Sequence, residues 1–115
     1  SFVIPNLVDD MHTGSTTADI QQGDTWLQQH LDAYVQWAKT HNSLFILTTD
    51  EEDEANGVEA NPNQIATIFV GQHVQIGTDN TNITHYDVLR TIEDIYGLSP
   101  ANNAANATAI TGIWN

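Results

Sequence analysis

The 115-residue sequence contains no cysteine and only two residues with a permanent positive charge, Lys39 and Arg90. Without cysteine, a disulfide, a thiolate nucleophile and a cysteine metal site are all excluded. Fifteen aspartate and glutamate residues give a formal net charge of −13, and a surface with this charge repels nucleic acid and anionic membranes. No apolar run approaches the length that spans a bilayer. We therefore expect neither a nucleic-acid partner nor membrane insertion.

The sequence also lacks a glycine-rich phosphate-binding loop and a nucleophile-elbow pattern. It opens at Ser1 without a charged and apolar leader segment, which is typical of a mature or cleaved product. Acceptor triplets for N-glycosylation at Asn82 and Asn106 suit a secreted chain, although a sequence this rich in Asn and Thr produces such triplets by chance. We expect a secreted or periplasmic protein.

The remaining composition indicates a folded chain. Apolar residues make up 40% of the sequence, and Phe, Tyr and Trp occur three times each, which argues against disorder despite the acidity. A chain of 115 residues forms one domain at most. That length is small for an α/β enzyme with its own closed site, which suggests that the chain belongs to something larger.

The central stretch, residues 43–54, reads SLFILTTDEEDE. The apolar run from Leu44 to Leu47 predicts a strand over residues 43–48 that is buried on both faces. Five acidic residues follow it, Asp50, Glu51, Glu52, Asp53 and Glu54. Open α/β sheets place their ligands at the carboxyl ends of strands, and carboxylates on a rigid element suit a divalent metal. The alternative interpretation is an acidic, solvated loop after a core strand.

Periodicity predicts the other elements. We expect strands at residues 2–4 and 65–70, an edge strand at 73–76, and helices from Thr25 to about His41 and from His85 to Tyr96. Thr84 with Asp87 predicts a capping box for the second helix, and Gly97 its end. Residues 99–115 predict an irregular Asn-, Ala- and Thr-rich tail pinned by Ile110, Ile113 or Trp114. The order of elements predicts an α/β fold with a mixed or largely parallel sheet.

Two further segments carry candidate metal ligands. Asp9, Asp10 and His12 follow the first predicted strand, and a histidine this close to an aspartate can share one metal ion with it in a loop. The alternative is an ordinary turn, in which Asp and Asn are common. His85 stands at a predicted helix N-terminus, where the helix dipole disfavours the protonated ring and so keeps it available as a ligand.

These segments resemble, in order, the second half of the alkaline phosphatase superfamily. They are most similar to its acid phosphatase and phospholipase C-like phosphoesterase family. The similar stretches are FVIPNLVDDMHTG, GDTWLQQHL, FILTTDEED, IATIFVG and THYDVLRTIEDIYGLSP. The most specific feature is the His-Tyr pair followed by the helix VLRTIEDIYGL.

The resemblance implies a metal-dependent phosphomonoesterase or phosphodiesterase with a three-layer α/β/α fold. Residues 1–98 would be the C-terminal part of that domain, and residues 99–115 a tail. The implied metal-site set is Asp10, His12, Asp50, Glu51 and His85, with Asp9 ranked lower. Mixed histidine and carboxylate ligation allows zinc, iron, manganese or calcium.

The family's Ser or Thr nucleophile lies in an N-terminal half for which these residues have no equivalent. We therefore expect no catalytic nucleophile in this chain, little activity of the chain alone, and an N-terminal portion of the same protein as a partner in binding a phosphate-ester substrate. The sequence departs from the family at two points. Asp50-Glu51 stands where many superfamily members have Asp-His, and Thr13 stands where closer relatives often have Asp.

A second hypothesis is a noncatalytic, secreted acidic domain that uses residues 50–54 to bind calcium or a basic partner. It explains the charge, but it does not explain the family's order of motifs. Convergence of Asp10, His12, Asp50 and His85 on one point favours the phosphoesterase, whereas metal binding by the acidic loop alone favours the second hypothesis.

Overall fold

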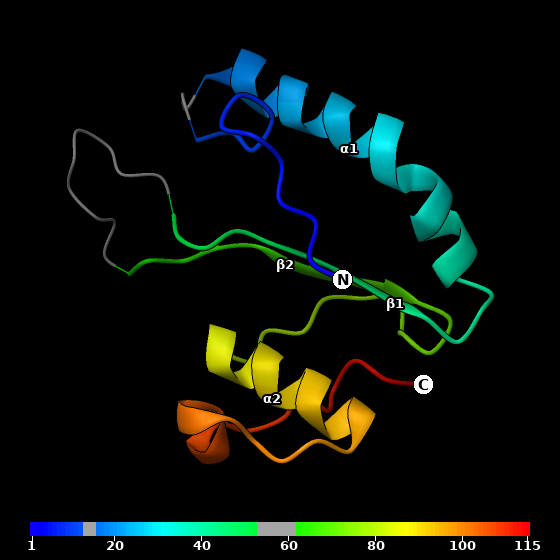
Figure 1. The fold of residues 1–115 in the computed structure, drawn as a ribbon, viewed down its shortest axis with the longest axis vertical. Helices are drawn as coiled ribbons and strands as arrows, with labels where there is room; N and C mark the ends of the chain where they lie inside the picture. Colours follow the sequence, from blue (N-terminus) through cyan, green and yellow to red (C-terminus); the bar gives the residue numbers. More distant parts are fainter. Residues whose placement is uncertain (13–15, 53–61) are drawn as a thin grey trace. The chain divides into compact units, whose positions relative to one another are not determined.

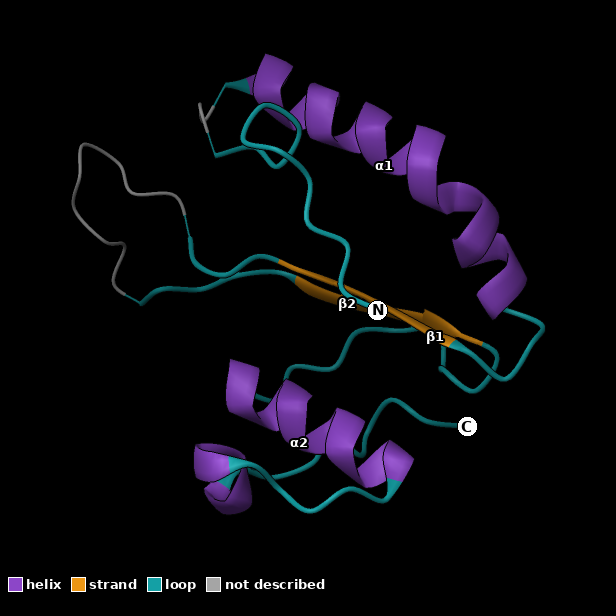
Figure 2. Cartoon of the chain, viewed as in Figure 1, coloured by secondary structure: helices purple, strands orange, loops and turns teal. Residues whose placement is uncertain are grey.

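The structure is a computed structural model that describes residues 1–12, 16–52 and 62–115 (Figure 1). Its elements, in chain order, are α1 (Thr17–Ala38), β1 (Leu44–Thr48), β2 (Thr67–Gly71), α2 (His85–Tyr96) and the 3-10 helix η2 (Asn102–Asn106) (Figure 2). The chain divides into two compact units, residues 1–72 and residues 73–115, called unit 1 and unit 2 below. Unit 1 holds α1 and both strands, and unit 2 holds α2 and η2.

In unit 1, β1 and β2 pair antiparallel, from Leu44 opposite Gly71 to Thr48 opposite Thr67. The predicted strands at 43–48 and 65–70 are thus confirmed with small shifts. The predicted burial of the first strand on both faces is wrong, because the residues of β1 are half-buried or exposed. Helix α1 contacts both strands, and the Tyr34 ring centroid lies 6.5 Å from that of Phe45. A Cβ atom on Gly71 would clash with the Ser43 carbonyl oxygen, so the close approach of the strands there requires glycine.

The α/β class is confirmed, and the three-layer arrangement remains a prediction. The strand pair formed by the described residues is antiparallel, which fits a mixed sheet and not a wholly parallel one. The predicted strand at residues 2–4 is wrong. Phe2 and Ile4 are 93% and 84% exposed and lie outside any strand, because an apolar run becomes a strand only where another backbone pairs with it.

Helix α1 begins eight residues before the predicted start at Thr25. The reason is a second Thr-x-x-Asp box, in which the Thr16 hydroxyl and N–H both donate to the Asp19 carboxylate. The helix ends at Ala38, short of the predicted His41. No helix of the described residues is long and apolar enough to cross a membrane.

In unit 2, α2 has the predicted bounds. Gly97 ends it with φ of 64°, and the Leu98 N–H donates to the Glu93 carbonyl oxygen at 2.8 Å. This is the left-handed ending that glycine permits. The predicted edge strand at 73–76 reduces to one bridge between Val74 and Trp114.

The segment after α2 is more ordered than the predicted irregular tail. It contains η2, contacts α2 and buries Ala104 completely. The predicted anchor Ile110 is 7% exposed. The division of the chain at residue 98 remains a prediction, but residues 99–115 pack within unit 2.

Candidate functional site

The first candidate segment is a turn in unit 1 that starts at Asn6. The backbone N–H groups of Asp9 and Asp10 donate to the Asn6 carbonyl oxygen at 2.9 and 3.1 Å. The Asp9 carboxylate accepts from the Asn6 amide at 2.9 Å and from the Gln22 amide of α1 at 3.2 Å. Asp9 therefore links the turn to α1.

Asp10 and His12 are held next to each other at the end of this turn. The His12 N–H donates to Asp10 Oδ1 at 2.9 Å, and Met11 between them has φ of 70°, a left-handed conformation that is uncommon outside glycine. The Met11 side chain packs against Gly23 of α1, where a Cβ atom would lie 2.8 Å from Met11 Cγ. The absence of a side chain at Gly23 thus makes room for Met11, which lies between Asp10 and His12. Asp10 is half-buried and His12 is exposed.

The second candidate segment follows β1. Asp50 and Glu51 are exposed there, and the Glu51 N–H donates to Asp50 Oδ1 at 3.1 Å. Glu52 has a different role, because its N–H donates to Asn63 Oδ1 at 2.7 Å and its carboxylate accepts from the Gln64 N–H at 3.0 Å. Glu52 therefore joins the segments after β1 and before β2. The predicted acidic residues Asp53 and Glu54, and the family departure at Thr13, lie outside the described residues.

The third candidate, His85, is the exposed first residue of α2 in unit 2. Its neighbours in the capping box hold the helix start, because the Thr84 N–H and hydroxyl donate to Asp87 Oδ2 at 2.7 and 2.8 Å. Burial alone would raise the pKa of Asp87, but hydrogen bonds from the Thr108 N–H and from Thr84 outweigh it and hold that pKa below the ordinary value of 3.8. Asp87 therefore acts as a hydrogen-bonded carboxylate.

Hydrogen bonds within two short segments of unit 1 hold candidate ligands close together. Asp10 lies beside His12, and Asp50 beside Glu51. Across residues 1–12, 16–52 and 62–115, no three His, Asp or Glu side chains are gathered as they would be around a metal ion. The five-residue ligand set remains a prediction. Its chemistry suits a divalent metal, because imidazole nitrogens and carboxylate oxygens are the usual ligands of such ions.

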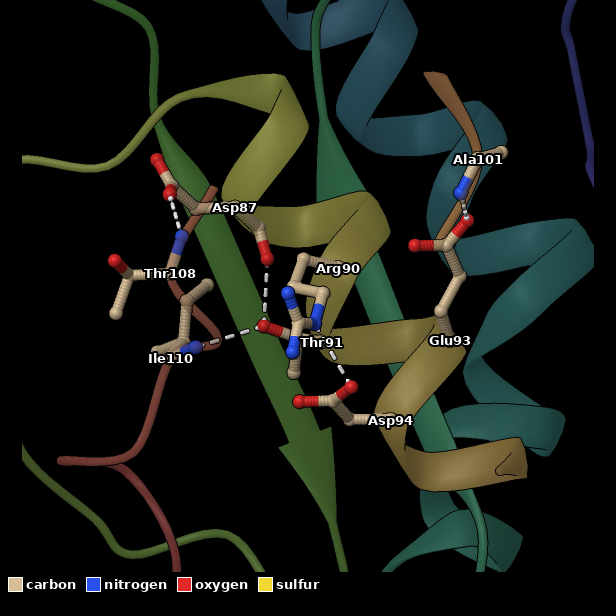
Figure 3. A network of polar contacts seen from close by, with 8 residues as sticks. All are labelled: Asp87, Arg90, Thr91, Glu93, Asp94, Ala101, Thr108 and Ile110. Atoms are coloured by element: carbon tan, nitrogen blue, oxygen red, sulfur yellow. Dashed lines mark hydrogen bonds and ion pairs between the residues drawn. The ribbon is translucent and has the colours of Figure 1, made fainter. Parts of the chain in front are cut away.

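Figure 3 shows polar contacts that the sequence did not predict, all within unit 2. The Thr108 N–H donates to Asp87 Oδ1 at 2.9 Å, the Ile110 N–H to the Thr91 hydroxyl at 2.8 Å, and the Ala101 N–H to Glu93 Oε1 at 2.8 Å. Thr91 and Glu93 are only 2% and 5% exposed. The sequence signal for these contacts is the presence of polar residues on the apolar side of the predicted helix, since polar groups are buried only with hydrogen-bond partners.

The Glu93 carboxylate is only partly satisfied by these contacts. Its Oε2 atom is buried and has no hydrogen-bond partner among the described residues. Arg90 lies on the same helix and pairs with Asp94 instead, at 2.8 Å. One of the two permanent cations of the chain is therefore engaged in an ion pair within α2.

The model of one family of known proteins, described as the Phosphoesterase family, matches residues 1–99. A phosphatidylinositol-3-phosphatase of Mycobacterium tuberculosis (strain ATCC 25618 / H37Rv) is 54% identical over 114 residues, covering 99% of this chain and 35% of that protein. A phosphate-repressible acid phosphatase of Penicillium chrysogenum is 28% identical over 102 residues, covering 84% of this chain and 23% of that protein. No solved structure matches at a significant level. The chain thus spans about a third or less of the length of these relatives.

Proposed function

Because this chain belongs to the Phosphoesterase family, we propose that it is the C-terminal portion of a metal-dependent hydrolase of phosphate esters. The observation that carries the proposal is the extent of the family match, since residues 1–99 include every candidate ligand. The names of the two relatives, a phosphatidylinositol-3-phosphatase and an acid phosphatase, also support phosphate-ester hydrolysis.

The proposed ligands are Asp10, His12, Asp50, Glu51 and His85. A bound zinc, iron, manganese or calcium ion would stabilise charge on the phosphoryl oxygens. The turn at residues 6–12 holds the Asp10 carboxylate beside the His12 backbone, and Asp50 and Glu51 follow the exposed end of β1. Both histidines bind metal only as neutral rings, so acid weakens their part of the site.

The nucleophile is proposed to come from an N-terminal portion of the same protein. Incompleteness of the chain is supported by its coverage of only 35% of the mycobacterial relative and by exposed apolar side chains such as Phe2, Ile76 and Tyr96, which larger folds cover. The isolated chain should then be inactive. A secreted or periplasmic location is part of the same proposal.

The test compares the complete protein with the isolated 115-residue chain. We expect the complete protein to hydrolyse p-nitrophenyl phosphate, to lose turnover in EDTA and to regain it with one of the four metals. The isolated chain should show no turnover. Because one relative is a phosphatidylinositol-3-phosphatase, phosphatidylinositol 3-phosphate belongs in the substrate panel.

Three results would contradict the proposal. Turnover that persists in EDTA would show that the reaction does not require a metal. Turnover by the isolated chain would show that it does not require the N-terminal portion. Calcium binding without hydrolysis by the complete protein favours the noncatalytic acidic domain instead.

Asp50→Asn serves as the site variant, with Asp32→Asn as its control, because the Asp32 carboxylate accepts a hydrogen bond from Gln36 on exposed α1 surface.

A further inference from the structure

Two backbone N–H groups of the C-terminal segment donate to side chains of α2. The Thr108 N–H reaches Asp87 Oδ1 at 2.9 Å, and the Ile110 N–H reaches the Thr91 hydroxyl at 2.8 Å. The acceptors lie one helical turn apart, and the Thr91 hydroxyl itself donates to the Asp87 carbonyl oxygen at 2.6 Å. Residues 108–110 are therefore attached to the first two turns of α2 by a continuous chain of hydrogen bonds (Figure 3).

The same chain reaches the residue before His85. Asp87 Oδ2 accepts from the Thr84 N–H and hydroxyl, while Oδ1 of the same carboxylate accepts from Thr108. One side chain thus ties the start of α2 to the C-terminal segment. His85 lies between the two capping residues, so its backbone is held from both sides.

Burial makes this attachment costly to break. Thr91 is 2% exposed and Ile110 is 7% exposed. Removing the Thr91 hydroxyl would leave the Ile110 N–H without its acceptor in a place that water reaches poorly, and an unsatisfied buried donor is strongly unfavourable. The helix start and the segment should therefore loosen together.

We propose that residues 108–110 form a clamp on α2 and that Asp87 and Thr91 are positioning residues for His85. This inference rests on the proposed function, in which His85 is a metal ligand. The clamp lies beyond residues 1–99, the range of the family match. The mycobacterial relative aligns over 99% of the chain, so it has a counterpart of most of this segment.

The test uses the complete protein and Co²⁺ as the probe, with absorbance titration to measure affinity and amide hydrogen exchange of the metal-free protein to measure the opening of residues 85–91. Thr91→Val should weaken Co²⁺ binding about tenfold, the low end of the range for groups that orient metal ligands. It should also speed exchange about tenfold, as expected when a buried hydrogen bond is lost. Thr91→Ser, which keeps the hydroxyl, should restore both values.

The matched control is Thr25→Val. Thr25 makes the same hydroxyl-to-carbonyl contact within its helix, to Gln21 at 2.7 Å, but it is exposed. Neither readout should change in this variant. If Thr91→Val does not fold, Thr108→Pro removes the N–H that donates to Asp87 Oδ1 together with the exposed Thr108 side chain. Ala107 before it is already extended at φ −87° and ψ 162°, as a residue before proline requires.

His85→Ala separates the two ways of failing. If this variant weakens Co²⁺ binding but Thr91→Val and Thr108→Pro do not, the clamp proposal is overturned and the ligand role stands. If His85→Ala leaves Co²⁺ affinity unchanged, the ligand role is wrong and the positioning role falls with it. Faster exchange in Thr91→Val with unchanged Co²⁺ affinity would reduce the clamp to a structural contact and also overturn the proposal.

Discussion

Helices α1 and α2 begin with the same Thr-x-x-Asp box but are held in different ways. In α1, the Asp19 carboxylate accepts from Thr16, three residues earlier in the chain, and Thr16 is exposed while Asp19 is half-buried. In α2, Asp87 accepts from Thr84 and also from Thr108, 21 residues away. The motif determines where a helix starts, whereas its tertiary partners determine how much of the fold depends on that start.

The threonines inside the helices differ in the same way. Thr25 and Thr91 both donate to the carbonyl oxygen four residues earlier, at 2.7 and 2.6 Å. Only the Thr91 hydroxyl also accepts, from the Ile110 N–H, among the hydrogen bonds of the described residues. The same local contact therefore stays within the helix for Thr25 and is connected to the C-terminal segment for Thr91.

The largest effect that separates the helices should come from Asp87→Ala. It removes the carboxylate that accepts from Thr84 in the capping box of α2 and from the Thr108 N–H. We therefore expect the free energy of unfolding of unit 2 to fall by about 2–3 kcal/mol. Amide hydrogen exchange of α2 measures this loss. Asp19→Ala is the matched variant and should affect α1 less, because the hydrogen bonds that its carboxylate accepts come from Thr16 in the same capping box and not from a distant segment. Equal losses in the two helices would contradict the comparison.

A smaller effect should distinguish the helix ends. Gly97 ends α2 at φ of 64°, whereas Lys39 ends α1 in the right-handed region at φ of −62°. Alanine is strained at the first angle and not at the second, so Gly97→Ala should destabilise unit 2 by about 1 kcal/mol, as measured by hydrogen exchange. Lys39→Ala should be close to neutral, and a loss there as large as in Gly97→Ala would show that the helix ends do not differ.

The smallest effect should be the pH dependence of α1. In the folded chain, the pKa of Asp19 lies below its ordinary value of 3.8, and the main cause is the hydrogen bond from the Thr16 side chain. The unfolded chain then binds more protons in this range, so stability rises with pH. The contribution is complete above the ordinary pKa and is lost as pH falls through the lower folded value.

Amide exchange of residues 16–20 between about pH 5 and pH 2 measures this effect around the ordinary pKa of aspartate, after correction for intrinsic exchange. Asp19→Asn removes the titrating group and should show no corresponding change. If wild type and Asp19→Asn have the same pH profile, the capping carboxylate does not stabilise α1.

Local signals predicted some elements well and others poorly. The bounds of α2 were correct because Thr84, Asp87 and Gly97 mark its ends within the sequence itself. The start of α1 lies before the predicted one because residues 17–24 are mostly polar, so apolar periodicity does not mark them, whereas the capping box of Thr16 and Asp19 does. The strand expected at residues 2–4 failed because a strand needs a partner, which a short apolar run does not specify.

The candidate site shows the same limit. Residue types and order identified the candidate ligands, and the turn at Asp10 and His12 follows from Asx chemistry between neighbours. The contact of the Met11 side chain with Gly23 could not be predicted from the sequence, since it depends on two segments packing together. For the same reason, the sequence placed Glu52 among the candidate acids, whereas its contacts with Asn63 and Gln64 make it a structural residue.

By itself, the sequence determined the acidic character of the chain, its α/β class, the family to which it belongs and the bounds of α2. Only the tertiary structure decided that residues 99–115 pack on α2 and that the side chains of Asp87, Thr91 and Glu93 accept hydrogen bonds from backbone N–H groups of that segment. The physical reason is separation along the chain. Helix caps act between neighbours and leave a local pattern, whereas a hydrogen bond across 19 or 21 residues depends on how the intervening segment folds.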